Sequence, residues 1–234
     1  MAPGGGSKSE SPILRPRILQ ASAPDAAPEE PPPVEEFPWS FWWKMDDAPA
    51  LAEEGGGPPF VAIKANDPAD MVLTQAAPLA PGSIHSVYTT AGTGIKVSGL
   101  PAPFSFGTDW YTWEYWASFV ADFRSSSVAQ FSTYPTSNSR LSVGYLPGGI
   151  QFSTWADDNL VTVPMPPNPV HVQWSFLINI GKLTRSIIRV NGTVCDDQAL
   201  DATWSWGGSP ECVFSSGHHE QTVDEVKLYK GVPA

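Results

Sequence analysis

The most regular alternation of apolar and polar positions in the chain lies between residues 108 and 120. One face of this stretch is entirely apolar and carries Tyr111, Trp113, Tyr115, Ala117 and Phe119. The opposite face is mixed and carries Thr112, Glu114, Trp116 and Ser118. A period of two is typical of a half-buried antiparallel strand, and each large aromatic side chain can bury roughly 150–250 Å². The pattern therefore predicts a central strand whose aromatic face lies in the core.

Shorter apolar runs, separated by turn residues, occupy the rest of the chain from residue 37 onward. They span 37–47, 60–64, 71–74, 84–88, 94–97, 128–133, 140–145, 149–155, 159–163, 170–179, 185–190, 193–195, 212–215 and 222–229. Two turns between them, Pro147-Gly148-Gly149 and Asn191-Gly192, predict hairpins. Asn-Gly favours a type I′ turn, because that turn needs positive φ at both central positions. With no helix expected beyond two turns, these runs predict an all-β, two-sheet antiparallel jelly-roll sandwich.

Residues 1–36 differ in composition from the rest of the chain. They hold eight prolines, including Pro31-Pro32-Pro33, and otherwise mainly small or acidic residues. Such a segment cannot bury enough apolar surface to offset its ordering entropy. We therefore expect an extended Pro-rich N-terminal arm over 1–36 and a sandwich domain over 37–234.

One island in the arm is apolar and basic. It consists of Ile13, Leu14, Arg15, Arg17, Ile18 and Leu19. Two interpretations stay open: an apolar patch tolerated in a tail, or a docking peptide that becomes ordered on the surface of a partner protein.

The charge of the chain narrows the range of partners. The formal net charge is −11 and only 16% of the residues are charged. Nucleic-acid binding needs clustered Lys and Arg, and anionic lipid attracts basic segments. No run approaches the roughly 18–20 apolar residues of a membrane span, and the N-terminus lacks the apolar core of a signal peptide. We therefore expect neither a nucleic-acid nor a membrane partner.

Several stretches, in the right order, resemble motifs of one structural family. Residues 107–116 (G-T-D-W-Y-T-W-E-Y-W) resemble its F-T-I-E-F-W strand, and 42–47 resemble its first strand. Val170-His171-Val172 followed by 188–194 (I-R-V-N-G-T-V) resembles its H-V-A and L-Y-V-N-G hairpin. Residues 223–232 (V-D-E-V-K-L-Y-K-G-V) resemble its closing I-D-E-V-R-I-Y strand. The family is that of laminin-G-like, concanavalin-A-like jelly rolls, and the closing segment resembles the versions found in bacteriophage virion proteins.

The resemblance implies a fold more clearly than a function, because this fold hosts lectins, glycosidases, protein-binding modules and capsid ornaments. Glycosidases of the family carry Glu-x-Asp-x-x-Glu on one strand, and this motif does not occur here. Asp109 and Glu114 should lie on opposite faces of the central strand, and so should the adjacent Asp224 and Glu225. We therefore expect no enzymatic activity.

Two sets of oxygen-rich residues are candidates for calcium, which some members of the family bind. They are Asp157-Asp158-Asn159 and Asp196-Asp197, both expected in loops. Solvated turn residues are the alternative, and we expect no other cofactor. His218-His219-Glu220 would need further ligands from elsewhere to hold zinc.

Three tryptophans in turn-rich surroundings, Trp155, Trp204 and Trp206, are candidates to stack on a sugar ring. Core packing is the alternative explanation for them. The two cysteines, Cys195 and Cys212, are compatible with either a disulfide or free thiols.

Together these observations predict a non-enzymatic virion structural protein, made in the host cytoplasm. Its arm would bind a capsid or tail protein of the same particle, so that the jelly roll decorates or cements the particle and adheres weakly to a host-surface glycan. Homo-oligomers are also compatible with the sequence. The alternative is a carbohydrate-binding lectin module outside any particle, and a glycoside hydrolase is the third class.

Overall fold

A computed structural model describes eleven segments of the chain. They are residues 40–48, 50–64, 73–89, 93–101, 108–119, 125–134, 139–146, 148–154, 160–205, 210–215 and 220–233. The chain divides into two units, 1–35 and 36–234, and every described residue belongs to the second.

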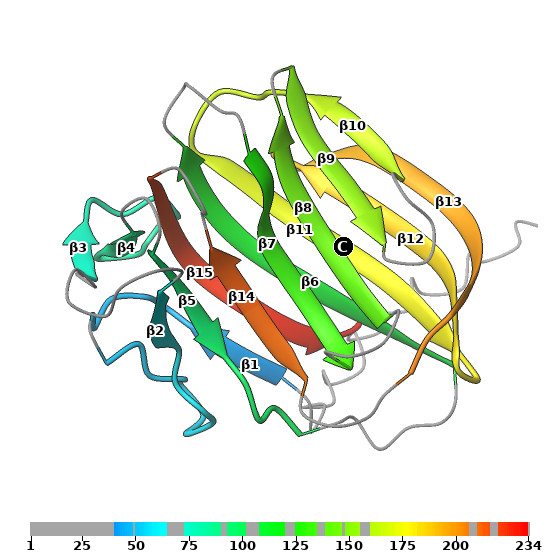
Figure 1. Cartoon of the computed structure of the whole chain (residues 1–234), viewed down its shortest axis with the longest axis horizontal. Helices are drawn as coiled ribbons and strands as arrows, with labels where there is room; N and C mark the ends of the chain where they lie inside the picture. The colour runs from blue at the N-terminus through cyan, green and yellow to red at the C-terminus, as the bar shows by residue number, and fades with distance from the viewer. Residues whose placement is uncertain are drawn as a thin grey trace, which may run out of the picture. The chain divides into compact units, whose positions relative to one another are not determined.

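The described residues of the second unit form two antiparallel sheets stacked face to face, and Figure 1 looks onto sheet B with sheet A behind it. Sheet A runs in the order β13 (Thr193–Thr203), β12 (Lys182–Val190), β11 (Val170–Asn179), β6 (Thr108–Phe119), β15 (Gln221–Lys230), β4 (Ser86–Thr89) and β3 (Thr74–Ala76), and β1 (Ser40–Trp43) also pairs with β15. Sheet B runs in the order β10 (Val161–Pro164), β9 (Gly149–Thr154), β8 (Ser139–Leu146), β7 (Ser125–Tyr134), β14 (Glu211–Ser215), β5 (Thr93–Val97) and β2 (Val61–Lys64). The predicted all-β two-sheet sandwich is confirmed.

The predicted central strand is β6, which pairs with β11 on one edge and β15 on the other. Its apolar face is buried from Tyr111 to Ala117, with none of these inward side chains more than 1% exposed. Trp113 reaches across to sheet B, where its ring centroid lies 6.3 Å from that of Phe131 and 5.9 Å from that of Phe214. Aromatic contacts from β6 therefore hold the two sheets together.

The two predicted hairpins are also present. Asn191 and Gly192, with φ of 51° and 77°, join β12 to β13 as a type I′ turn requires. Leu146 pairs with Gly149 at the turn between β8 and β9. Strand β13 continues to Thr203, well past the predicted end at residue 195. Its Asp residues disfavour a strand by propensity, but β13 lies at a sheet edge, where Asp197 bonds to Arg185.

Strand β15 contains a β-bulge at Glu225. Asp224 lies opposite Trp116 of β6 and Lys227 lies opposite Glu114, so three residue steps on β15 match two on β6. The extra residue is accommodated at Glu225, whose φ is 48°. Asp224 and Glu225 were expected on opposite faces, and this expectation is wrong. The bulge interrupts the alternation and places both carboxylates on the outer side of sheet A.

The two cysteines are free thiols. Cys195 lies in β13 of sheet A, and Cys212 lies in β14 of sheet B, fully buried. Burial raises the pKa of the Cys212 thiol well above its ordinary value. Of the two options that the sequence leaves open, the structure has the reduced pair.

Candidate functional site

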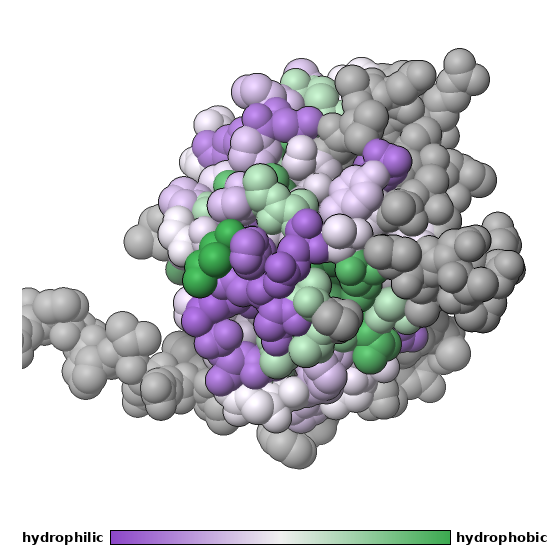
Figure 2. Space-filling view, turned by 90° about the vertical axis from the view of Figure 1, so that its left-hand side faces the viewer, coloured by the Kyte–Doolittle hydropathy of each residue, from purple (hydrophilic) through white to green (hydrophobic). Residues whose placement is uncertain are grey.

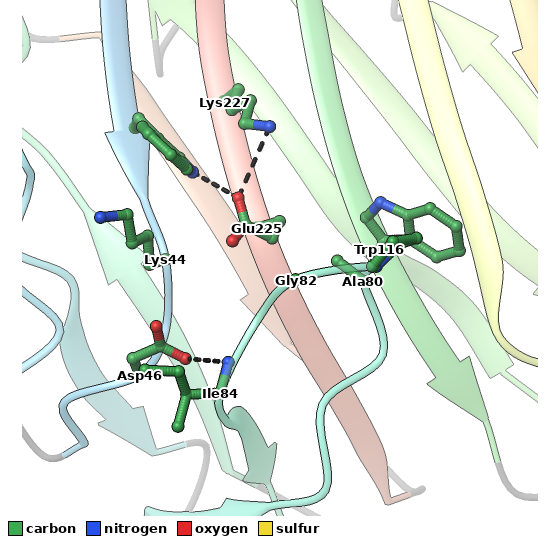
Figure 3. Close-up of a pocket in the computed structure, with 10 residues that line it drawn as sticks. Lys44, Asp46, Ala80, Gly82, Ile84, Trp116, Glu225 and Lys227 are labelled. Atoms are coloured by element: carbon green, nitrogen blue, oxygen red, sulfur yellow. Dashed lines mark hydrogen bonds and ion pairs between the residues drawn. The ribbon is translucent and has the colours of Figure 1, made fainter.

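A pocket of about 340 Å³ opens on the outer side of sheet A, where β1 and β4 meet β15 along one edge. Figure 3 shows its walls. It is lined by Trp42, Lys44, Asp46, Ala80, Pro81, Gly82, Ile84, Trp116, Glu225 and Lys227. These residues come from β1 and the segment just after it, from β6 and β15, and from the connection between β3 and β4, so only the folded sheet brings them together.

The pleat of β1 decides which of its side chains reach the pocket. Phe41 and Trp43 point into the core, at 9% and 0% exposure, and Trp42 between them is 37% exposed on the outer side. After the strand, Met45 adopts a φ of 64°, and the chain turns so that Asp46 lines the pocket. One short aromatic strand therefore supplies both the core and one wall of the site.

Asp224 holds the segment that carries Ala80 against β15. Its Oδ2 accepts hydrogen bonds from the backbone N–H groups of Leu79 and Ala80, at 2.9 Å and 3.0 Å, and its Oδ1 accepts from the Ser83 hydroxyl at 3.0 Å. Burial raises the pKa of the Asp224 carboxyl, and these hydrogen bonds offset only part of that effect. Both oxygens of the Asp224 carboxylate therefore accept hydrogen bonds that hold one wall of the pocket in place.

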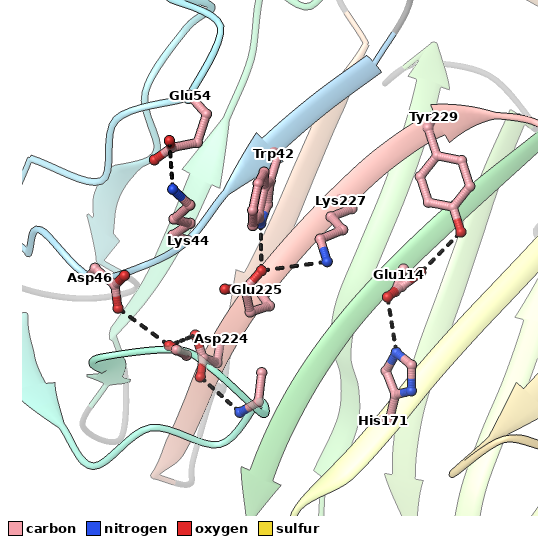
Figure 4. Close-up of polar contacts among 12 residues, drawn as sticks. Trp42, Lys44, Asp46, Glu54, Glu114, His171, Asp224, Glu225, Lys227 and Tyr229 are labelled. Atoms are coloured by element: carbon pink, nitrogen blue, oxygen red, sulfur yellow. Dashed lines mark hydrogen bonds and ion pairs between the residues drawn. The ribbon is translucent and has the colours of Figure 1, made fainter. Parts of the chain in front are cut away.

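Asp46 fixes the other end of the same segment. Its Oδ1 accepts hydrogen bonds from the backbone N–H groups of Ile84 and His85, at 3.0 Å and 2.7 Å, and lies 3.3 Å from the oxygen of the Ser83 hydroxyl. Figure 4 shows how the two carboxylates tie this connection to β15 and β1. The wall is therefore held in place before any ligand arrives.

Glu225 and two lysines surround the Trp42 ring. The indole Nε1 donates a hydrogen bond to Glu225 Oε2, which also lies 3.5 Å from Lys227 Nζ. The ammonium groups of Lys44 and Lys227 lie 4.6 Å and 5.0 Å from the Trp42 ring centroid, within cation–π range. Lys44 also pairs with Glu54 at 2.8 Å. These contacts fix the orientation of the Trp42 ring.

The second tryptophan of the pocket, Trp116, stacks on His171 of β11. The ring centroids lie 4.5 Å apart and the planes differ by only 6°. His171 Nε2 lies 3.1 Å from Glu114 Oε1. Glu114 Oε2 accepts hydrogen bonds from Gln173 at 3.1 Å and from the Tyr229 hydroxyl at 2.9 Å.

Glu114 is ionised under all ordinary conditions. Burial raises the pKa of its carboxyl, but hydrogen bonds from His171, Gln173 and Tyr229 together outweigh burial and lower that pKa to about 2. Conversely, burial and the nearby Glu114 charge raise the pKa of the Tyr229 hydroxyl, which therefore stays protonated and able to donate.

The side of the molecule that carries β1 to β5 presents polar and apolar surface next to each other. Figure 2 shows a hydrophilic band with smaller hydrophobic patches beside it. Beside the pocket, the Ile84 side chain is 67% exposed and that of Trp42 is 37% exposed. A surface of this kind suits a ligand that has both hydroxyl groups and an apolar face.

Comparison with known proteins identifies the fold but no family. No protein-family model matches the chain, and no curated protein sequence matches it significantly. Domain 4 of AbnA, a GH43 extracellular arabinanase from Geobacillus stearothermophilus in complex with arabinotriose, superposes with a TM-score of 0.56 at 11% identity, covering 83% of this chain and 93% of that domain. The chain has a concanavalin-A-like fold.

Two further structures share this concanavalin-A-like fold. The receptor-binding domain of botulinum neurotoxin mosaic serotype C/D gives a TM-score of 0.55 at 10% identity, covering 81% of this chain but only 46% of the toxin domain. A carbohydrate esterase of the Shiga toxin-encoding bacteriophage phi24B gives 0.53 at 7% identity, covering 82% and 97%. The chain thus spans about half of the toxin domain and nearly all of the other two structures.

Most of the residues proposed from the sequence for ligand binding lie outside the described part of this concanavalin-A-like sandwich. These are Trp155, Trp206, Asp157, Asp158, Asn159, His218, His219 and the arm residues Ile13, Leu14, Arg15, Arg17, Ile18 and Leu19.

Trp204 is described, and the structure has it in the core, the alternative to sugar contact that the sequence leaves open. The side chain is 2% exposed and its ring centroid lies 5.6 Å from that of Phe176 in the core. The backbone N–H of Trp204 donates to the Gly181 carbonyl at 2.7 Å, which draws the chain after β13 back over the sheet. Trp204 is therefore a core residue.

The expected loop placement of Asp196 and Asp197, the second calcium candidate, is wrong, because both lie within β13. Asp196 accepts a hydrogen bond from the Gln198 side chain. Asp197 forms a bidentate salt bridge with Arg185, with N–O distances of 2.8 Å and 2.9 Å. Across the described segments, no group of three or more His, Cys, Asp or Glu side chains is arranged to hold a metal ion. No helix in those segments is long and apolar enough to cross a membrane.

Sequence reasoning missed the residues that form the pocket. Trp42 was assigned to the first core strand without a surface role, and Glu225 was considered only as a catalytic carboxylate. A signal for Trp116 was nevertheless present. It is a large aromatic residue on the polar face of β6, where solvent exposure would otherwise favour a smaller or charged residue.

Trp204→Ala should destabilise the protein rather than impair a surface site. We expect the free energy of unfolding to fall by about 3–5 kcal/mol, as for other buried tryptophans, measured by urea denaturation followed by circular dichroism. Met165→Ala, at a position that is 40% exposed, is the control and should change stability by less than about 0.5 kcal/mol. Equal stability of the two variants would show that Trp204 is not a core residue.

Glu114→Gln should have a pH-dependent effect on stability. Since the folded-state pKa of about 2 lies below the ordinary value of 4.5, the carboxylate stabilises the fold above about pH 4.5, and this contribution is lost as the pH falls toward 2. We expect the variant to be less stable at neutral pH by about 2–3 kcal/mol. Denaturation curves at a series of pH values measure the difference, which should shrink on acidification. A difference independent of pH would contradict the assignment.

Proposed function

We propose that this concanavalin-A-like sandwich is a non-enzymatic carbohydrate-binding module whose sugar ligand occupies the pocket between Trp42 and Trp116. The observation that carries the proposal is that two tryptophan rings from different strands meet at one preformed pocket with polar walls. Its volume, about 340 Å³, falls within the range of about 300–1,000 Å³ that is typical of small-molecule sites. Tryptophan offers an apolar face to C–H groups and a polar N–H at its edge.

The carboxylates around the pocket support binding rather than hydrolysis. A glycosidase needs one carboxylic acid that can protonate the leaving group and a second carboxylate beside the bond that breaks. Asp224 has the raised pKa of such an acid, but it is fully buried beneath the segment that it anchors. Asp46 and Glu225 hold backbone N–H groups and the Trp42 ring, respectively. The acidic groups thus maintain the shape of the pocket.

The structures with the same fold are compatible with this proposal. The arabinanase domain was determined with arabinotriose bound, the toxin domain is named for receptor binding, and the phage protein is a carbohydrate esterase. At 7–11% identity they establish no function for this chain. They support the proposal only together with the pocket, whose two tryptophans and polar walls are compatible with a sugar.

We further propose that the module is displayed on a bacteriophage particle, on the capsid or tail surface, through its N-terminal arm. This proposal depends on the resemblance of residues 223–232 to the versions found in bacteriophage virion proteins, and on residues 1–36, in which four aliphatic and two arginine residues form one island within an acidic, Pro-rich segment. An extended peptide can pair its backbone with a neighbouring protein and place alternate side chains in pockets. Display of many copies would convert weak sugar contacts into avidity.

Replacing either pocket tryptophan should abolish sugar binding while leaving the fold intact. We expect Trp116→Ala and Trp42→Ala to lose the glycans that the full chain binds on a glycan array, because each removes one ring of the pocket. Met165→Ala, which is exposed away from the pocket, is the control and should keep the full binding pattern. If both tryptophan variants retain the wild-type pattern, the pocket is not the sugar site.

Deleting residues 1–36 should separate display from sugar binding. We expect the shortened chain to lose co-sedimentation with virion-sized particles and to keep its glycan-array pattern. A full-length variant with Ile13, Leu14, Ile18 and Leu19 all changed to Ser tests the island alone and should behave like the deletion. Unchanged co-sedimentation of both variants would refute the anchoring role of the arm.

A further inference from the structure

The residues behind Trp116 occupy three neighbouring strands in a fixed register. Trp116 and Glu114 follow one another on the outer face of β6, and β11 places His171 directly opposite Trp116 and Gln173 directly opposite Glu114. On the other side, β15 places Tyr229 one pleat away from the position opposite Glu114. The Glu114 carboxylate therefore accepts hydrogen bonds from one direct cross-strand neighbour, Gln173, and two diagonal ones, His171 and Tyr229.

This network leaves the His171 ring little freedom. Nε2 is held at 3.1 Å from a carboxylate that also accepts hydrogen bonds from Gln173 of β11 and from Tyr229 of β15. The imidazole side chain is 17% exposed and the Glu114 side chain 13% exposed, so water competes only weakly for these contacts. Because Val170 and Val172 on either side are fully buried, the pleat of β11 keeps His171 on the outer face.

The position of the His171 ring in turn restricts Trp116. The planes of the two rings are nearly parallel, with an angle of 6° between them, and their centroids lie 4.5 Å apart. His171 therefore covers one face of the indole. Trp116 nevertheless lines the pocket. The part of the Trp116 indole that His171 does not cover is therefore the part available to the pocket.

We propose that Glu114 and His171 are positioning residues that fix Trp116 as a one-sided platform, so that a sugar ring stacks only on the face of Trp116 turned away from His171. The sugar contact rests on the proposed function, whereas the fixation of Trp116 stands on the register and contacts of β6, β11 and β15. Pre-organisation of this kind improves affinity because the aromatic ring loses no freedom when the ligand binds. Gln173 and Tyr229 take part indirectly by holding the Glu114 carboxylate.

Fluorine NMR of the full chain labelled with 5-fluorotryptophan tests the fixation directly. The Trp116 signal is assigned from its loss in Trp116→Phe. We expect a broad, dispersed Trp116 signal in the wild type, typical of a fixed ring, and a narrowed signal shifted toward that of exposed tryptophan in His171→Ala. His171→Phe retains a flat ring without the hydrogen bond and should restore most of the dispersion. Glu114→Gln should give an intermediate signal, and Gln198→Ala, on the distant strand β13, should give the wild-type spectrum.

A Trp116 signal that is unchanged in His171→Ala would overturn the proposal, as would failure of His171→Phe to restore the dispersion lost in the alanine variant. The remaining nine tryptophan signals report on folding in every sample, so a general collapse of the fold is recognised and is not mistaken for release of one ring. If the fold of His171→Ala collapses, His171→Gln, which removes the ring but keeps a polar side chain, replaces the alanine variant.

Affinity electrophoresis in gels containing soluble arabinan tests whether the position of Trp116 affects sugar binding. If the wild type is retarded, His171→Ala should weaken binding roughly threefold to tenfold, the effect of losing one aromatic contact, and His171→Phe should recover it. Equal retardation of wild type and His171→Ala would contradict the platform role. Absence of retardation for the wild type counts against arabinan as a ligand under the proposed function, and the NMR result then decides the positioning proposal alone.

Discussion

The extra residue in β15 is the constraint on which both the core and the pocket depend. With uninterrupted alternation from Val223, position 227 would point inward and Val226 and Leu228 would point to solvent. The bulge at Glu225 restores the correct phase, so that Val223, Val226 and Leu228 are all fully buried and Lys227 faces outward. The same step lets one edge of β15 pair first with β4 and then with β1. The pocket lies where these two partners meet.

This arrangement requires a backbone conformation that Glu225 does not favour. A left-handed φ in a residue with a Cβ costs about 1–2 kcal/mol, and Met45, at the end of β1, also has positive φ. Glu225 lies in β15, and Met45 lies in the segment after β1, next to the pocket residues Lys44 and Asp46. Contacts around them offset the cost: Glu225 accepts from the Trp42 indole and pairs with Lys227, and Met45 is fully buried. Two of the five described non-glycine residues with positive φ, Met45 and Glu225, thus lie beside the pocket, and Leu51, Ile180 and Asn191 are the other three.

The parts of the fold that follow from local pattern could be predicted from the sequence, whereas the site could not. The alternation in β6 determines its buried face, and Asn191-Gly192 determines a hairpin, because each depends on neighbouring residues alone. The spacing Val223, Val226, Leu228 departs from a period of two and is a signal for the bulge, but it becomes interpretable only with the register against β6. The choice between core packing and sugar contact for Trp204 stays open in the sequence for a similar reason. Its surroundings are turn-like, and its burial depends on the distant Gly181 carbonyl and Phe176 ring.

The outer face of sheet A shows how one strand can serve stability and function through its two sides. Inward residues of β6 join the sheets, and the outward Glu114 and Trp116 connect a polar cluster to the pocket. The carboxylates on this face are each committed to neutral or cationic hydrogen-bond donors of the protein, and this commitment keeps Glu114 ionised and Asp224 buried. A carboxylate held in this way cannot readily exchange protons with a bound molecule. The acidic residues of this surface therefore determine where its aromatic rings and backbone segments lie.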